Sequence, residues 1–245
     1  MSIQALTRSQ QEAAATINLG ATIPGPVVPG SILLVSAAMA GAVSSQVDAL
    51  SWAGVPLTRA HRAEAPGGTV LVNEWWYVVA PAHGANFLNG TISGAPRATV
   101  ELFYVDIIDV VTPFGPIEDA IGTGAAVQVV LAPTHDVGTA VDLFNGRDFP
   151  YGLGGSYTPG PGQGFLDLGT VGTATGFYIA TNKIADNGNT TMSGTIVPDM
   201  PWLYTALELR APGEPGAPPP QAQAKEPLGE YVKHELHERT GIVIP

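Results

Sequence analysis

The sequence contains no cysteine, and charged residues are scarce. Without cysteine the chain has no disulfide, no thiolate nucleophile and no cysteine-based zinc site. Charged residues make up only 13% of the 245 residues, against roughly 25% in ordinary soluble domains. A surface with so little charge indicates extensive burial against other protein, so we expect the chain to work inside an assembly.

Basic residues are the scarcer kind of charge: ten lysines and arginines face 21 acidic residues, which gives a net charge of −11. A phosphate backbone would be repelled, and no stretch gathers basic residues into a patch, so we expect no nucleic-acid partner. The apolar run over residues 31–43 is shorter than the about 20 residues that span a bilayer. The first residues lack the features of a signal peptide. We therefore expect no membrane partner and folding in a cytoplasm.

Glycine and proline are abundant, at 30 and 22 residues, and are spread between apolar runs. This punctuation is typical of many short strands and turns, and predicts an all-β fold, an antiparallel β-sandwich of jelly-roll type. The stretch Val70–Pro81 consists largely of β-branched and aromatic residues. Both of its faces are apolar, with Leu71 and Trp75 on one and Val72 and Trp76 on the other. It is predicted to be the central strand of the sandwich, covered on both sides.

Other segments show the same preference for strands. A tight hairpin is expected within residues 47–59, with its turn at Ala53-Gly54. A second hairpin is expected from residues 175–182 and 190–197. Polar or glycine-rich loops are expected at residues 61–68 and 146–176. The remaining strands are predicted over residues 31–40, 86–94, 97–110, 125–132, 139–143 and 202–210.

The chain divides into three parts by composition. Residues 1–23 are expected to be an N-terminal arm, with either a strand near residues 13–19 or a helical turn near residues 10–15. The β-sandwich is assigned to residues 24–212. Residues 213–245 begin with a proline-rich linker and end in an apolar segment that can form a short helix over residues 226–241. The apolar side chains of this last part are the predicted partner-binding residues Tyr231, Val232, Leu236, Ile242, Val243 and Ile244.

Several stretches together resemble a β-sandwich module that recurs in bacteriophage structural proteins and bacterial surface proteins. The stretches are the apolar strand Gly30–Ala40, S-W-A-G-V-P-L-T-R, E-W-W-Y-V-V-A-P, V-D-I-I-D-V-V-T-P and W-L-Y-T-A-L-E-L-R-A-P. The resemblance covers most of residues 24–212. It implies a sandwich used for virion decoration, fibres or adhesion, with no catalytic residue among those matched. The arm, the glycine-rich loop and the C-terminal part depart from it.

The sequence patterns that could indicate a catalytic, metal or sugar-binding site match such sites poorly. His234 and His237 are three residues apart, whereas the helix of a zinc protease places its two histidines four apart. Asp106 and Asp109, with Glu101 nearby, differ in position by an odd number and would point to opposite faces of a strand. The sugar-stacking candidates, more typical of a core, are Trp52, Trp75, Trp76 and Trp202. We therefore predict no catalytic residue, no cofactor and no metal.

The function predicted from these features is that of a non-enzymatic structural protein of a phage virion. A capsid decoration or another head or tail accessory protein that binds the particle lattice fits best. Its expected partners are further copies of itself, with a trimer as the first guess, and virion proteins such as the major capsid protein. The alternative is a carbohydrate-binding or adhesin module, for which exposed coplanar aromatic rings would be diagnostic. A hydrolase on a jelly-roll scaffold would instead need converging carboxylates or histidines.

Overall fold

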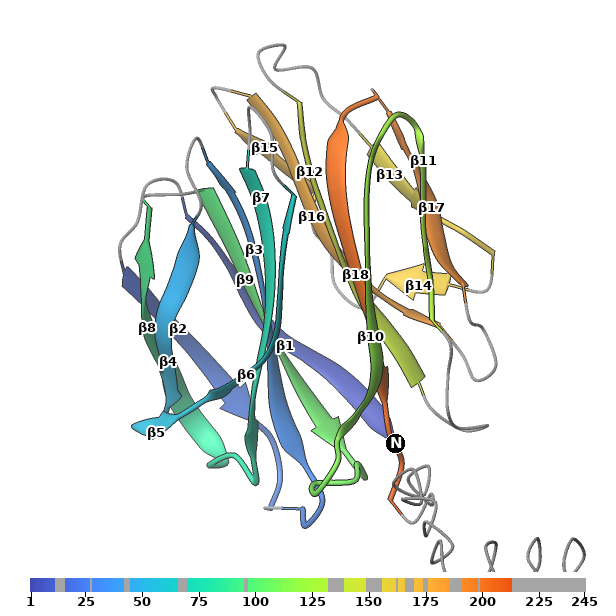
Figure 1. Cartoon of the computed structure of the whole chain (residues 1–245). Helices are drawn as coiled ribbons and strands as arrows, with labels where there is room; N and C mark the ends of the chain where they lie inside the picture. Colours follow the sequence, from blue (N-terminus) through green and yellow to red (C-terminus); the bar gives the residue numbers. More distant parts are fainter. Residues whose placement is uncertain are drawn as a thin grey trace, which may run out of the picture. The chain divides into compact units, whose positions relative to one another are not determined.

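The structure is a computed structural model of the whole chain (Figure 1). It describes residues 1–11, 16–26, 28–41, 45–65, 70–94, 97–131, 139–148, 156–161, 163–165, 170–173, 176–185, 191–197 and 199–212. Within these residues the regular structure consists of strands, and all of the strand pairs are antiparallel. The all-β, antiparallel prediction is confirmed.

The first half of the chain, residues 1–112, folds into two sheets, and we call it module 1. Sheet A has five strands, in the order β1 (Ser2–Gln11), β9 (Arg97–Asp106), β3 (Ile32–Gly41), β7 (Val70–Val79) and β6 (Thr58–Ala65). Sheet B has four strands, in the order β2 (Thr16–Ile23), β8 (Gly84–Ser93), β4 (Gln46–Trp52) and β5 (Val55–Pro56).

Residues 113–212 form module 2, which again has two sheets. Sheet C has the order β10 (Phe114–Thr123), β18 (Pro201–Leu209), β12 (Thr139–Asp148), β16 (Gly176–Ala185) and β14 (Gln163–Phe165), and β15 (Thr170–Thr173) also pairs with β16. Sheet D has the order β11 (Ala126–Val130), β17 (Thr191–Val197) and β13 (Ser156–Pro159).

The two modules repeat one strand order. Adding nine to each label turns β1-β9-β3-β7 into β10-β18-β12-β16, and β2-β8-β4 into β11-β17-β13. Most consecutive strands lie in facing sheets, as in the Greek-key winding of a jelly roll. The exceptions are β4–β5 in sheet B, β6–β7 in sheet A and β14–β16 in sheet C. The sandwich expected over residues 24–212 is thus two jelly-roll modules in tandem. Figure 1 shows them side by side, module 1 in blue to green and module 2 in green to orange.

The four sheets stack in the order B, A, C, D, with a hydrophobic core in each of the three spaces between them. Sheets A and C are therefore covered on both faces. Strand β3 shows why its sequence is apolar without alternation: Leu33 and Val35 face sheet B, while Ile32 and Leu34 face sheet C. Burial of both faces of these sheets inside the molecule explains part of the low content of charged residues, in addition to any contact with other proteins.

The strand predicted over Val70–Pro81 forms β7, with the predicted division of its faces. Leu71 and Trp75 pack toward sheet C, and Val72 and Trp76 pack toward sheet B. The middle strand of sheet A is β3, so β7 is an inner strand but not the central one. The turn at Ala53-Gly54 is also confirmed: the φ angles are 50° and 83°, the left-handed pair that a two-residue hairpin requires.

Several strands were not predicted from the sequence, and β1, β6 and β10 among them lie at sheet edges. The expected arm forms β1 and β2, which pair with β9 and β8. The expected polar loop at residues 61–68 is largely β6, and residues 114–123, which carried no clear strand pattern, form β10. Edge strands pair on one side only and tolerate polar residues, so their sequences lack an apolar alternation.

The second predicted hairpin is wrong. Strands β16 and β17 belong to different sheets, C and D, because the chain crosses from one layer of module 2 to the other between them. The glycine-rich stretch at residues 146–176 contains β13, β14 and β15 rather than one continuous loop. The compact unit ends at Glu214. The predicted linker and docking segment, residues 213–245, lies outside the described residues.

Candidate functional site

The acidic residues singled out in the sequence do not form a pair. Asp106 ends β9 and accepts a hydrogen bond from the Ser2 backbone N–H at 2.6 Å. Asp109 lies beyond the strand, and its Oδ1 accepts bonds from the backbone N–H groups of Val111 and Thr112 at 2.9 and 3.2 Å. These hydrogen bonds hold the pKa of Asp109 below its ordinary value. Each carboxylate thus fixes a local backbone, which is a structural task.

The tryptophans proposed as sugar-stacking candidates are all core residues. Trp52 and Trp76 pack between sheets A and B, Trp75 packs between sheets A and C, and Trp202 packs between sheets C and D. The interpretation of these residues as core is confirmed. Among the aromatic side chains that the structure describes, Phe87 is the one that lies largely in solvent, with 56% of its surface exposed.

The remaining sequence candidates lie outside the described residues. They are His234, His237 and the docking residues Tyr231, Val232, Leu236, Ile242, Val243 and Ile244. Within the described part of the chain, no three histidine or acidic side chains gather as metal ligands. That part also lacks a helix with the length and apolar character needed to cross a membrane.

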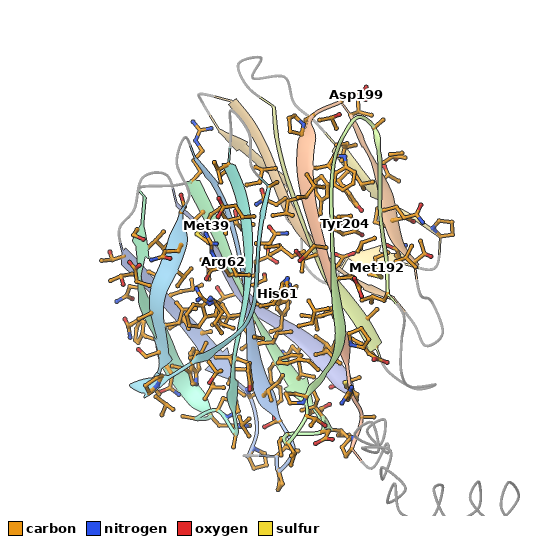
Figure 2. All side chains as sticks on the ribbon, in the orientation of Figure 1. Met39, His61, Arg62, Met192, Asp199 and Tyr204 are labelled. Atoms are coloured by element: carbon orange, nitrogen blue, oxygen red, sulfur yellow. The ribbon has the colours of Figure 1, made fainter. Side chains whose placement is uncertain are left out.

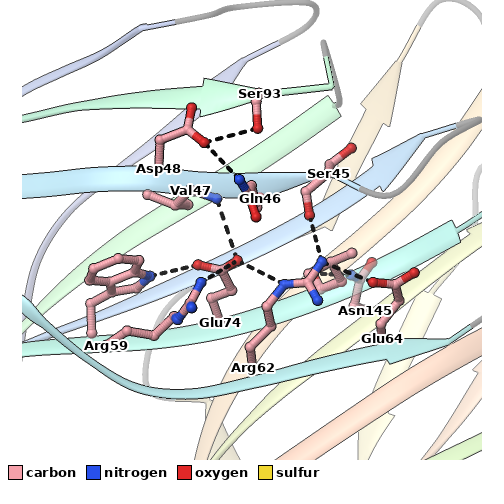
Figure 3. A network of polar contacts seen from close by, with 12 residues as sticks. Ser45, Gln46, Val47, Asp48, Arg59, Arg62, Glu64, Glu74, Ser93 and Asn145 are labelled. Carbon is pink, nitrogen blue, oxygen red and sulfur yellow. Dashed lines mark hydrogen bonds and ion pairs between the residues drawn. The ribbon is translucent and has the colours of Figure 1, made fainter.

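The densest polar cluster surrounds Glu74, a β7 residue that is fully buried between sheets A and B (Figure 3). One carboxylate oxygen accepts the Trp76 indole N–H at 2.8 Å. The other contacts Arg62 at 3.3 Å and Arg59 at 3.8 Å, and it accepts the Val47 backbone N–H of sheet B at 3.4 Å. A single carboxylate therefore joins β4, β6 and β7 across two sheets.

Arg62 extends the Glu74 cluster toward the surface. Its guanidinium donates to the Ser45 carbonyl at 3.1 Å and to the Glu64 carboxylate at 2.9 Å. Arg59 lies 5.5 Å from the centre of the Trp76 ring, within reach of a cation–π interaction. The arginines are partly exposed whereas Glu74 is not. The cluster thus connects a buried carboxylate to arginines at the protein surface.

Burial raises the pKa of Glu74, and the Trp76 hydrogen bond, the two arginines and the Val47 N–H offset only part of that effect. Sequence reasoning missed this residue because Glu74 was read only as part of a strand. A signal was present: a glutamate inside a run of buried strand residues must find a partner. Arg59 and Arg62, in the segment just before, were the available cations.

A second set of polar contacts joins the two modules. The Asn145 amide of β12 donates to the Met39 and Val72 carbonyls of sheet A at 3.0 and 3.1 Å. In the opposite direction, Asn73 donates to the Leu143 carbonyl at 3.0 Å and to the Thr205 hydroxyl at 3.2 Å. These buried amides fix how sheets A and C face each other.

Nearer the surface, His61 of β6, which Figure 2 labels, contacts Asp119 of β10 at 2.8 Å. β6 is an edge strand of sheet A, and β10 is an edge strand of sheet C. The contact therefore links the modules at the edges of these two sheets. The two chain halves are therefore joined by a core, by amide hydrogen bonds and by an edge contact, and we expect them to behave as one body.

Module 2 encloses a carboxylate of its own. The Tyr204 hydroxyl donates to the buried Asp142 carboxylate at 2.6 Å, and the Tyr157 hydroxyl lies 3.5 Å from that of Tyr204. Burial, followed by the charge of Asp142, raises the pKa of both tyrosines. Both phenols therefore stay protonated and serve as hydrogen-bond donors inside the core between sheets C and D.

The outer faces of the stack differ from these cores in being polar but almost uncharged. On sheet D, the exposed strand residues are Ala126, Gln128, Val130, Thr158, Thr195 and Val197, none of which is charged. On sheet B, the exposed strand residues are Thr16, Asn18, Gly20, Thr22, Gln46, Asp48, Ala49, Val55, Pro56, Gly84, Ala85, Phe87, Asn89 and Thr91, and Asp48 alone is charged. In a protein with a net charge of −11, such faces are suited to contact with protein.

Comparison of the chain with protein-family models, curated proteins and solved structures finds no match.

Proposed function

We propose that the protein is a non-enzymatic structural component of a phage virion, a capsid decoration or another head or tail accessory protein. It acts by binding the particle lattice and further copies of itself. The observation that carries the proposal is the pair of nearly uncharged outer sheet faces on a stack of four sheets. Jelly rolls are common in capsid and lectin domains, although a fold alone does not define a function.

The buried polar groups favour a structural role over a chemical one. Glu74, Asn73 and Asn145 are fully buried and bonded to a facing sheet, and the buried Asp142 is bonded to a neighbouring strand of its own sheet, so these groups hold the stack together. The C-terminal segment adds a means of attachment. Its first part is proline-rich, a composition that favours an extended chain, and its last part is apolar enough to dock on another protein.

Truncation after Ala211, in a phage that encodes the chain, tests this role. We expect near-native melting of the shortened protein, because residues 1–211 retain all three cores, together with weaker incorporation into particles. Quantitative mass spectrometry of gradient-purified particles measures the incorporation. The full chain should be present in many copies, in fixed ratio to the major capsid protein. Full chain found only outside the particles would contradict the proposal.

A carbohydrate-binding module is the alternative, and one observation favours it. The Phe87 ring lies over Gly20, where an added Cβ would come within 3.2 Å of it, and the neighbouring Asn18 and Asn89 offer amide groups. A lone exposed ring does not make the coplanar pair that this function uses. Glycan-array binding that is lost in Phe87→Ala would establish the alternative; we expect no binding above background, with the wild type and the variant alike.

A further inference from the structure

The turn that follows β9 displays apolar side chains to solvent on a strained backbone. We define the β9 bend as residues 106–113. Ile107 has a φ of 52° and is 51% exposed, and Val111 is 85% exposed. A β-branched residue in the left-handed region is a true outlier, since glycine or asparagine normally occupies it. Strain of this kind persists where surrounding structure enforces it, and it gathers at functional positions.

Hydrogen bonds hold the β9 bend in place. The Asp109 carboxylate accepts bonds from Val111 and from both the backbone and the hydroxyl of Thr112, the last at 2.8 Å. The Ile108 backbone N–H donates to the Gly30 carbonyl at 2.8 Å. Ile107 and Val111 are thus presented by a backbone that is already ordered, which lowers the entropy cost of binding to them.

The last described residues of module 2 lie beside this bend. The Asp109 N–H donates to the Arg210 carbonyl at 2.9 Å, and the Arg210 N–H donates to the Pro113 carbonyl at 3.0 Å. The sequence then runs through P-G-E-P-G-A-P-P-P before it becomes apolar again. A proline-rich sequence favours an extended chain of roughly 3 Å per residue, a reach that would allow the apolar residues beyond it to contact a second copy.

We propose that the apolar C-terminal segment of one copy, residues 226–245, docks on the β9 bend of a second copy. Ile107 and Val111 form the receiving surface, and Ile242 and Ile244 are among the groups received. The inference deepens the proposed structural role by naming the surface through which copies join. Because donor and receiver are different surfaces, repetition of the contact is heterologous and closes into a ring, such as the expected trimer, or continues along a lattice.

A double-mutant cycle in the full-length chain tests the contact. Val111→Asp, Ile244→Asp and the double variant are compared with the wild type by sedimentation velocity over a concentration series. Each single substitution should weaken self-association by about tenfold or more, since it replaces one buried apolar side chain with a charge. The double variant should be little worse than either single variant, because both remove the same contact.

Two further variants separate docking from folding. Ile121→Asp changes an exposed apolar residue outside the β9 bend and the two outer faces, 56% exposed in β10 of sheet C, and should leave self-association unchanged. Ile107→Gly removes the side chain while giving the φ of 52° the residue that suits it, so Tm should hold or rise by a few degrees while association weakens.

Three results would overturn the inference: additive effects in the cycle, unchanged association of Val111→Asp, or a wild-type chain that stays monomeric at all concentrations. The proposed virion role stands or falls separately. A chain that is found in particles while Val111→Asp associates normally refutes the contact alone. If the double-mutant cycle shows non-additive effects but the chain never enters particles, the virion role alone is refuted.

Discussion

Replacing Trp75 with alanine is expected to lower the free energy of unfolding by about 3–5 kcal/mol, the range for removing a large aromatic side chain from a packed core. Trp75 is fully buried and lies in the core between sheets A and C. That core contains residues from both modules, among them Phe103 from β9 and Leu207 from β18. The cavity would therefore weaken the contact that joins the two halves of the chain.

Trp75→Phe is the matched control. The Trp75 indole N–H is buried and has no hydrogen-bond partner among the described residues. Phenylalanine removes this unsatisfied donor and leaves a smaller cavity, so its cost should be well below that of alanine. Urea unfolding followed by circular dichroism measures both variants. Equal losses for phenylalanine and alanine would show that the packing around Trp75 is looser than described.

The shape of the unfolding curve carries separate information. Because the core, the Asn73 and Asn145 amides and the His61–Asp119 contact all cross between modules, the wild type should unfold in one transition. Trp75→Ala should either keep that single transition at lower urea or begin to separate the modules. Two transitions in the wild type would mean that each jelly roll is stable without the other.

Inner strands could be predicted from the sequence because a strand that is covered on both sides carries apolar residues on both faces. β7 is apolar on each side, and this pattern correctly predicts a strand covered from both directions. It does not say which sheet does the covering. Whether the second layer comes from the same sandwich or from a second one depends on pairings between distant residues, and the sequence carries no local signal for them.

The edge strands were missed for the opposite reason. β6 reads T-R-A-H-R-A-E-A and buries little beyond Ala63 and Ala65, and β10 contains Pro116, Glu118 and Asp119. Such residues protect a sheet edge from further pairing, so they disrupt the alternation by which a strand is recognised. The repeat of strand order between the modules was hidden too, since it is a repeat of topology and the two halves differ in their edge strands.

The candidate sites show a similar limit. The tryptophans could be assigned to the core because burial is the usual state of that residue. The Glu74 cluster could not be assembled, because β-strand pairing with a bulge between Arg59 and His61 decides which side chains of β6 face the carboxylate. A shift of one residue would turn Arg62 away from it.

Glu74 gives the second large effect, and two substitutions there should behave very differently. Glu74→Ala is expected to cost about 3 kcal/mol or more. It leaves the Trp76 indole N–H and the Val47 N–H without their buried acceptor, and it separates Arg59 and Arg62 from their shared counter-charge. Glu74→Gln keeps the volume and one acceptor oxygen. Its cost at neutral pH should be at most about 1 kcal/mol, because it also avoids burying a charge.

The pH dependence follows from the direction of the pKa shift. Burial raises the pKa of Glu74 in the folded chain above the ordinary value of 4.5, so the folded state binds its proton more tightly than the unfolded state does. The stability that Glu74 contributes is then greatest below pH 4.5 and declines as the pH rises through the raised pKa. Glutamine does not titrate. The stability of Glu74→Gln relative to the wild type should therefore improve as the pH rises across this window.

Urea unfolding of the wild type, Glu74→Gln and Glu74→Ala at several values between about pH 4 and about pH 8 measures the effect. Glu64→Gln is the control, because Glu64 touches Arg62 from a partly exposed position and should have little influence on stability. A Glu74→Gln variant that loses stability relative to the wild type as the pH rises would mean that the arginines outweigh burial. The carboxylate would then act as an ionised clamp between sheets A and B, with its pKa lowered instead of raised.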